Sequence, residues 1–377
     1  MRTQHRGRAR SAVALGIASV VVLAGCAAGS GEETTDGFAP DDEELVFVDG
    51  VLQPLSDGFP SSALTLVVVD EAGSDDGIYA RTFAEAARDI SPVDIRIDDR
   101  PEFGATYGAW EAIDWTSEQR GGDEGYYMTV VTLPGSTLDL LETPVTADLG
   151  STMESLNTIM LTELVPYILV TRPDAPWGTD FSAMIEYAQA NPGEVKYISR
   201  GPGAGPNIAM QNYLQVAGGV DLNTSIGGTH PEIMTALGAG VGDVAVTLPG
   251  VASPFLQDGT VQLMTCTGNI NPCAANWGEE RPNAASQLDI DNDPWGSGRG
   301  LVTAEGVPES HRLWLEALVK SVTEQDSFIE ARTSIPGVGM AQLNKADALE
   351  LQKVAYRFAY PIIEALGNLV DGAPLPD

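Results

Sequence analysis

The chain has 377 residues and a formal net charge of −33 at pH 7, from 53 Asp and Glu against 20 Lys and Arg. A surface this anionic repels the phosphates of DNA and RNA, which excludes nucleic-acid binding as a function. The length predicts two domains, and no run of about 18 apolar residues follows the N-terminal segment.

The first segment in chain order has the pattern of a lipoprotein export signal. Four arginines between residues 2 and 10 precede an apolar run over residues 13–23, which is too short for a membrane span. The run Leu-Ala-Gly-Cys that ends at Cys26 matches a lipobox. Residues 1–25 are therefore predicted to be removed, and a lipid on Cys26 would hold the exported protein at the outer face of the cell membrane. An ordinary secretory signal with an incidental cysteine is the alternative.

Residues 26–62 are rich in Gly, Ser, Thr, Asp, Glu and Pro, and this composition predicts a flexible tether. Two short apolar runs, at residues 45–48 and 51–52, are exceptions that suit a short strand or packing on the folded body.

From residue 63 onward, runs of apolar β-formers alternate with helical periodicity, which predicts an α/β protein with largely parallel sheets. A second unit begins near Pro166, and the chain ends in a helix over residues 345–369 that is interrupted near Pro361. The expected strands cover residues 64–69, 93–97, 126–131, 167–170, 195–199, 244–247, 261–265 and 300–303, and the other expected helices cover 78–90, 104–118, 180–191, 207–217, 232–237 and 309–324.

Two glycine-bearing turns join a predicted strand to a predicted helix, at residues 70–77 and 200–207. Glycine lets the backbone approach a ligand closely, and a helix N-terminus offers unpaired N–H groups to an anion. Arg200 would add a bidentate partner for a carboxylate. The turns can also be plain connections, because Gly-x-Gly alone is a weak signal. The candidate ligand-binding residues are Gly73, Ser74, Asp75, Asp76 and Gly77 in the first turn, and Arg200, Gly201, Gly203, Ala204, Gly205 and Asn207 in the second.

Several other kinds of site lack their signatures. Residues 201–207 lack the third glycine of a dinucleotide fingerprint and no phosphate-binding loop is present, so no cofactor is predicted. Outside the signal the histidines are His230, in a loop that can reach a pocket, and His311, which is predicted to be solvated on a surface helix. Neither belongs to a cluster of metal ligands, so no metal site is predicted. No catalytic residue is predicted either, although the many carboxylates leave an acid–base pair open.

Two tryptophans and two cysteines add further expectations. Trp177 and Trp295 lie near the expected domain crossings and suit either packing between domains or an aromatic cleft wall, so Trp295 is a further candidate ligand contact. Cys266 and Cys273 are predicted to form a structural disulfide in an oxidising compartment, since their spacing is too wide for a redox Cys-x-x-Cys motif.

Six segments occur in a characteristic order along the chain: 65–81 with Ala80-Arg81, Arg100-Pro101 before Gly104 and Gly108, 123–126, Ala190-Asn191-Pro192-Gly193, Gly201-x-Gly203, and 294–308 with Gly306-Val307-Pro308. Through these segments the chain from residue 64 onward resembles the substrate-binding proteins of tripartite tricarboxylate transporters, also called Bug proteins. Gly77 stands where the family usually has Asp, Ala204 replaces a usual Ser or Thr, and Asn207 replaces a usual His. These departures concern the ligand more than the fold.

The resemblance implies a type II periplasmic-binding-protein fold, in which two α/β lobes joined by two crossover strands enclose a ligand cleft. It assigns residues 63–165 and 300–377 to lobe 1 and residues 166–299 to lobe 2. It also implies that the two glycine turns hold a ligand carboxylate, with a third contact from Gly227, Gly228 and Thr229.

We therefore expect a non-enzymatic, lipid-anchored receptor. It would capture a small carboxylated metabolite, such as a di- or tricarboxylate, and deliver it to the membrane permease of a tripartite tricarboxylate-type transporter. Hinge closure would bury the solute, driven by contacts made only in the closed form. A receptor of the same fold for amino acids or peptides is the nearest alternative, and a sensor module for a signalling partner or an exported hydrolase are the others.

Overall fold

The computed structural model describes residues 45–70, 73–103, 108–268, 281–373 and 375. All of them belong to one compact unit, Asp42–Asp377. The predicted signal, the lipidation site Cys26 and the cysteine Cys273 lie outside the described residues. Within this part of the chain, no helix combines the length and the apolar character that crossing a membrane requires.

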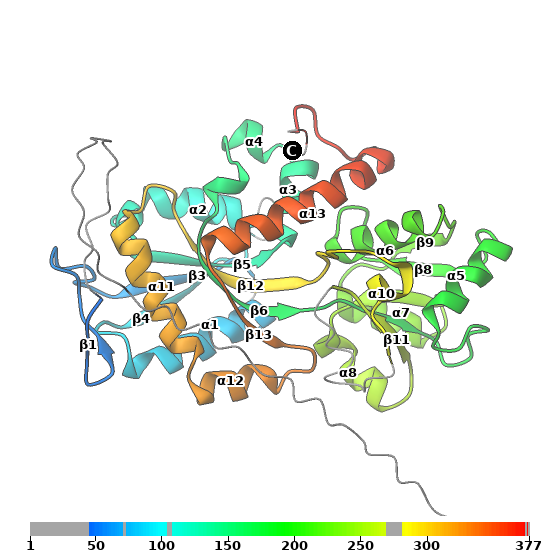
Figure 1. Ribbon diagram of the computed structural model, residues 1–377, viewed down its shortest axis with the longest axis horizontal. Coiled ribbons are helices and arrows are strands. Elements are labelled where there is room, and N and C mark those ends of the chain that lie inside the picture. Colours follow the sequence, from blue (N-terminus) through cyan, green and yellow to red (C-terminus); the bar gives the residue numbers. More distant parts are fainter. Residues whose placement is uncertain (1–44, 71–72, 104–107, 269–280, 374, 376–377) are drawn as a thin grey trace, which may run out of the picture. The chain divides into compact units, whose positions relative to one another are not determined.

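A six-stranded sheet forms lobe 1 (Figure 1). Its strands are β3 (Leu64–Val68), β4 (Ile95–Asp99), β5 (Tyr127–Leu133), β6 (Asn157–Val165), β12 (Ser297–Thr303) and β13 (Gly339–Leu343). They lie in the order β13-β6-β12-β5-β3-β4. The sheet is mixed, because β3 runs parallel to β4 and β5 while β12 runs antiparallel to β5 and β6, and β13 antiparallel to β6. The prediction of largely parallel sheets is therefore wrong, because three of the five strand pairings here are antiparallel and so are two of the four in the sheet of lobe 2.

Helices cover both faces of that sheet. Met128 and Val130 of β5 pack in one core with α1, α11 and α12, whereas Val131 and Leu133 pack on the other face with α2, α3 and α13. This alternation follows from the two-residue period of a strand. The helices are α1 (Asp75–Ala86), α2 (Ala109–Glu118), α3 (Gly135–Glu142), α4 (Val145–Asp148), α11 (Glu309–Thr323), α12 (Asp326–Thr333) and α13 (Lys345–Leu366).

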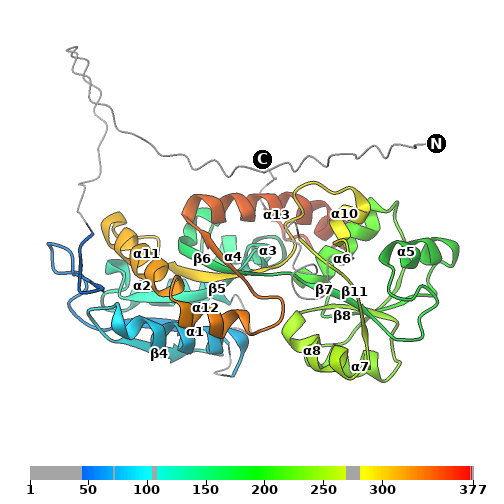
Figure 2. The ribbon, with the colours of Figure 1, turned by 60° about the horizontal axis from the view of Figure 1, so that its bottom comes forward.

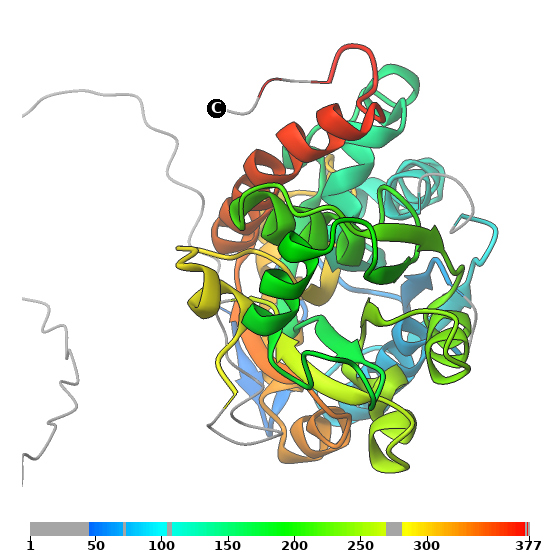
Figure 3. The ribbon, with the colours of Figure 1, turned by 90° about the vertical axis from the view of Figure 1, so that its right-hand side faces the viewer.

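A five-stranded sheet forms lobe 2, which faces the viewer in Figure 3. Its order is β11-β7-β10-β8-β9, with β8 parallel to β9 and β10 and with β7 antiparallel to β10 and β11. The strands are β7 (Ile168–Thr171), β8 (Lys196–Ser199), β9 (Asn223–Ile226), β10 (Val244–Thr247) and β11 (Gln262–Cys266), and the helices are α5 (Phe181–Ala190), α6 (Gly205–Val216), α7 (His230–Gly238), α8 (Pro249–Gln257) and α10 (Ala284–Leu288).

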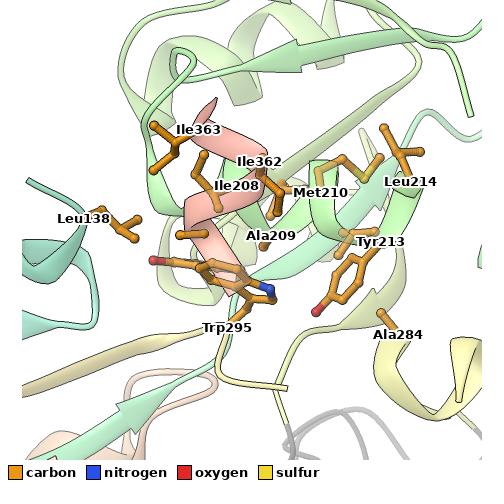
Figure 4. Packing of buried hydrophobic residues seen from close by; sticks show 14 of the residues in the cluster. Leu138, Ile208, Ala209, Met210, Tyr213, Leu214, Ala284, Trp295, Ile362 and Ile363 are labelled. Carbon is orange, nitrogen blue, oxygen red and sulfur yellow. The ribbon is translucent and has the colours of Figure 1, made fainter. Parts of the chain in front are cut away.

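The chain passes from lobe 1 to lobe 2 between β6 and β7, and returns between β11 and β12. A second link is apolar: α13 contacts both α3 of lobe 1 and α6 of lobe 2, as Figure 2 shows. Figure 4 shows Trp295 within this junction, with Leu138 of α3, Ile208 of α6 and Ile362 of α13 around it. The lobes are therefore joined by packed side chains as well as by the crossover strands.

The N-terminal part of the body begins before residue 62, the end predicted for the tether. β1 (Phe47–Val48) and β2 (Val51–Leu52) pair antiparallel, in agreement with the short strand that the apolar runs suited. Leu52, Leu55 and Phe59 are buried in the core beneath α1 and α11. Burial of these three side chains means that the residues from 51 to 60 are structural rather than a linker.

The predicted elements of residues 64–133 and 167–266 coincide with observed ones to within a few residues, but β6, β9, β13, α3, α4, α8, α10 and α12 were not expected. The helix predicted to break near Pro361 is continuous from Lys345 to Leu366. It ends at Gly367, whose φ of 75° is the left-handed conformation favoured after a helix.

Candidate ligand-binding site

The first turn leads from β3 into α1. Ser74 caps the helix, because its Oγ accepts a hydrogen bond of 3.1 Å from the N–H of Gly77. The N–H of Gly77 is thus used within the protein. None of the hydrogen bonds among the described residues uses the N–H groups of Ser74, Asp75 or Asp76, which leaves three donors at this helix start.

The side chains of Asp75 and Asp76 are held by two arginines that sequence reasoning missed. Arg299 of β12 donates from Nε to Asp76 Oδ1 at 2.6 Å and approaches Asp75 Oδ2 with Nη2 at 2.8 Å. Arg332 of α12 reaches Asp75 Oδ1 from Nη2 at 3.3 Å. The two guanidinium groups therefore bind the carboxylates that would otherwise repel an anionic ligand at this turn.

A third carboxylate completes the cluster. Glu163 of β6 is fully buried and lies 3.0 Å from Arg299 Nη1 and 2.5 Å from Arg332 Nε. Burial alone would lower the pKa of Arg299, but Asp76, Asp75 and Glu163 together raise it above its ordinary value. Because β6 and β12 lead to the two crossovers, these ion pairs tie the first turn to the strands that join the lobes.

The second turn leads from β8 into α6. The N–H of Gly201 donates to Ser199 Oγ at 3.1 Å, and the Asn207 side chain donates from Nδ2 to the carbonyl of Pro202 at 2.7 Å. Asn207 therefore shapes the turn from a buried position instead of reaching a ligand. The N–H groups of Gly203 and Gly205 have no acceptor among the described residues, so they remain available to an anion.

Arg200 stands at the start of this turn with an exposed side chain, and the ion pairs among the described residues do not include it. Its charge acts on two neighbours. Burial raises the pKa of Tyr167 to about 12, against a lowering effect of Arg200. Burial and, to a smaller extent, the charge of Arg200 lower the pKa of His230 to about 3. Arg200, Tyr167 and His230 therefore form one cluster beside the Gly203 and Gly205 donors.

The third predicted contact is largely occupied by the protein itself. The N–H of Gly227 donates to the carbonyl of Ser199 at 2.8 Å, and the N–H of Thr229 donates to Glu232 Oε2 at 2.7 Å in a capping box. Of the three residues, Gly228 alone has an N–H without an acceptor among the described residues. His230 follows as a neutral side chain, with Nδ1 3.0 Å from Thr247 Oγ1.

Lobe 1 presents a carboxyl group to the second turn. Glu142, at the end of α3, places Oε2 1.6 Å from the position that a Cβ on residue 203 would occupy, so any larger residue there would require the Glu142 carboxyl group to move. Tyr167 places its hydroxyl 2.6 Å from the corresponding point on Gly205. The hydrogen bonds and ion pairs among the described residues do not join the first turn directly to the second.

The two tryptophans differ in role. Trp177 donates from Nε1 to Thr171 Oγ1 at 3.2 Å and packs on Tyr187, so it belongs to the interior of lobe 2 and not to a wall between the lobes. Trp295 is buried and lines a cavity of about 210 Å³ at the crossovers, together with Pro134, Pro166 and Leu351. Neither glycine turn contributes to the lining of this cavity.

Three further predictions concern His311, the cysteines and metal binding. The prediction that His311 is solvated is wrong. Its side chain is buried, stacks on Phe59 with 4.0 Å between the ring centroids, and has Nε2 2.7 Å from Asp57 Oδ2. Cys266 is disulfide-bonded, while Cys273 lies outside the described residues, so their pairing stays a prediction. Among the described residues, no group of three His, Cys, Asp or Glu side chains could hold a metal ion.

Comparison with known proteins identifies the family. No functionally curated protein matches the sequence. A solute-binding protein of the TctC type from Polaromonas has the same fold, with a TM-score of 0.66 and 21% identity over 81% of this chain and 99% of that one. The malate-bound MatC of Rhodopseudomonas palustris has a TM-score of 0.59 and 18% identity, over 81% of this chain and 100% of that one. An adipate-bound protein of R. palustris has a TM-score of 0.59 and 16% identity, over 82% of this chain and 98% of that one. Residues 79–275 match the family described as tripartite tricarboxylate transporter family receptor. The chain therefore belongs to the tripartite tricarboxylate transporter receptor family.

Proposed function

We propose that this receptor captures a small carboxylate between its lobes through the second glycine turn and delivers it to its membrane transporter. The observation that carries the proposal is the pair of N–H donors at Gly203 and Gly205, with the exposed Arg200 beside them; within the described part of the chain neither donor has an acceptor and Arg200 has no ion pair. A cation and two backbone donors at a helix start suit a carboxylate, and they do so locally in a chain whose net charge is −33.

We propose that the first turn binds the same solute as the second turn, from the opposite lobe. Its N–H groups at Ser74, Asp75 and Asp76 could receive a second carboxyl group of the solute, because Arg299 and Arg332 hold the aspartate side chains. Malate and adipate, bound in the two Rhodopseudomonas proteins, are both dicarboxylates. A dicarboxylate that bridges the turns would favour the closed arrangement of the lobes, since each turn belongs to a different lobe.

The proposal also covers the membrane anchor, the disulfide and the absence of catalysis. Receptors of this family act outside the cytoplasm, and we propose that a lipid on Cys26 and the segment up to residue 44 tether this one to the cell membrane. The Cys266–Cys273 disulfide would close a short loop of lobe 2. We also propose that the site performs no catalysis, since burial lowers the pKa of His230 to about 3 and so makes it a weak base toward the Thr247 hydroxyl that lies 3.0 Å from its Nδ1.

Thermal unfolding with a panel of ligands tests the proposal. Residues 42–377 are heated with succinate, malate, adipate and citrate, and with the corresponding amides as neutral controls. A ligand at a hundredfold excess over its Kd stabilises the native state by about 2.7 kcal/mol, which raises Tm by several degrees. We expect at least one acid to raise Tm and its amide to have no effect. Equal stabilisation by acids and amides, or none by any acid, contradicts the proposal.

A further inference from the structure

Glu142 brings an acid from lobe 1 to the turn that we assign to the solute carboxylate in lobe 2. Its Oε2 lies 1.6 Å from the site of a Cβ on Gly203, and a solute held by the N–H groups of Gly203 and Gly205 would lie beside it. The inference below rests on the proposed function, because it concerns the same turn.

The described surroundings of Glu142 supply no cation that pairs with it. Asp139 lies one turn earlier on α3, and Asn368, just after α13, donates a hydrogen bond to the Glu142 carboxylate. The facing turn contributes Arg200 at its start, whose charge acts on Tyr167 and His230. Among the described residues, no ion pair includes Glu142 or Asp139.

Both carboxyl groups are easy to protonate. Burial raises the pKa of Glu142 to about 6, although the hydrogen bond from Asn368 lowers it. Burial, and then the charge of Glu142, raise the pKa of Asp139 to about 7. These pKa values lie close to neutral pH, so a further negative charge at the turn is enough to change the protonation state.

Two carboxylates at one turn repel each other unless one of them takes up a proton. We infer that Glu142 is the proton-bearing partner of the bound solute, so that carboxylate capture takes up one proton from the medium. The solute enters as a carboxylate, the Glu142 carboxylate gains the proton, and an O–H···O⁻ hydrogen bond forms between the two. Such charge-assisted bonds are short and strong.

The consequence is an affinity that decreases as pH rises. Below about pH 6 Glu142 already carries its proton and binding needs no uptake. Above it, the free receptor must first be protonated, so the affinity falls by up to about tenfold per pH unit until the pKa of the complex is reached. Above about pH 6.5 both carboxyl groups of an aliphatic dicarboxylate are ionised, so the pH dependence of the affinity there comes from the receptor.

Calorimetry of malate and adipate binding tests this inference. Titrations between pH 5.5 and 8.5, each in two buffers of different ionisation enthalpy, give Kd and the number of protons exchanged. The variants are Glu142→Gln, Asp139→Asn and, as a matched control, Glu186→Gln at an exposed position of α5. For the wild type and the control we expect uptake approaching one proton at pH 8 and an affinity at least about tenfold weaker than at pH 6.

Glu142→Gln mimics the protonated acid without a titratable group. We expect it to bind at pH 8 as tightly as the wild type binds at pH 6, with no proton uptake, while Asp139→Asn still takes up a proton. Binding by the wild type without uptake overturns the inference and leaves the proposed function standing. Proton uptake that persists in the Glu142→Gln variant but is absent in the Asp139→Asn variant also overturns the inference. Failure of both probes to bind any variant at any pH counts against the proposed function itself.

Discussion

Arg299 and Glu163 stand directly opposite each other on the antiparallel strands β12 and β6, and their side chains meet at 3.0 Å in the interior of lobe 1. Arg299 also binds Asp75 and Asp76 of the first turn. A single side chain therefore connects the proposed ligand turn to both strands that lead into the crossovers.

Removal of Arg299 should destabilise the fold strongly. Arg299→Met leaves Glu163 and two aspartates with Arg332 as their only cation in this cluster, and an uncompensated buried charge costs about 3–5 kcal/mol. Urea unfolding measures the change. Arg88→Met is the matched control, because Arg88 pairs with Glu85 at 2.7 Å on the surface and such pairs contribute less than about 1 kcal/mol. Similar losses in the two variants would refute the role given to the buried cluster.

His230 should make the fold less stable in acid. Its folded pKa is lowered to about 3, whereas an unfolded histidine has a pKa of 6.5. As pH falls below 6.5, the unfolded state takes up a proton that the folded state does not, so unfolding becomes easier by up to about 1.4 kcal/mol per pH unit. His230→Gln should flatten this part of the stability profile. A wild-type imidazole that titrates near 6.5 by NMR would disprove the prediction.

Arg200 should matter for binding and not for stability. Arg200→Gln removes the cation beside the Gly203 and Gly205 donors, and a charge-assisted hydrogen bond of about 1.5–3 kcal/mol predicts a loss of roughly 10- to 100-fold in malate affinity. Because Arg200 is exposed, the free energy of unfolding should change by less than about 0.5 kcal/mol. Arg120→Gln, at another exposed position, is the control. An unchanged affinity in Arg200→Gln would remove Arg200 from the site.

Most helices and strands could be predicted from local sequence patterns. Buried strands such as β3 and β7 consist mostly of apolar β-formers, and α5 is bounded by an Asp180 cap and a stop at Asn191. The sequence did not predict β6, because Asn157, two threonines and Glu163 interrupt its apolar pattern. The partners that make Glu163 acceptable inside the protein lie 136 and 169 residues further along the chain.

The site could be anticipated only in part for the same reason. Glycine spacing and a helix start pointed to the turn at Gly203 and Gly205, because those cues are local. The contact of Glu142 with Gly203 and the hold of Arg299 on Asp76 join elements far apart in sequence, and spacing carries no signal for either. A lone Glu or Arg inside an apolar run is the one available cue, since a buried charge needs a partner.

NMR of the amide groups of Gly203 and Gly205 during titration with a dicarboxylate that binds tests the central claim most directly. If both N–H groups donate to the solute carboxylate, their proton resonances move downfield and saturate at the Kd found by calorimetry. If the solute binds while these two amides stay unchanged and others move, the carboxylate is held elsewhere and the proposed site is wrong.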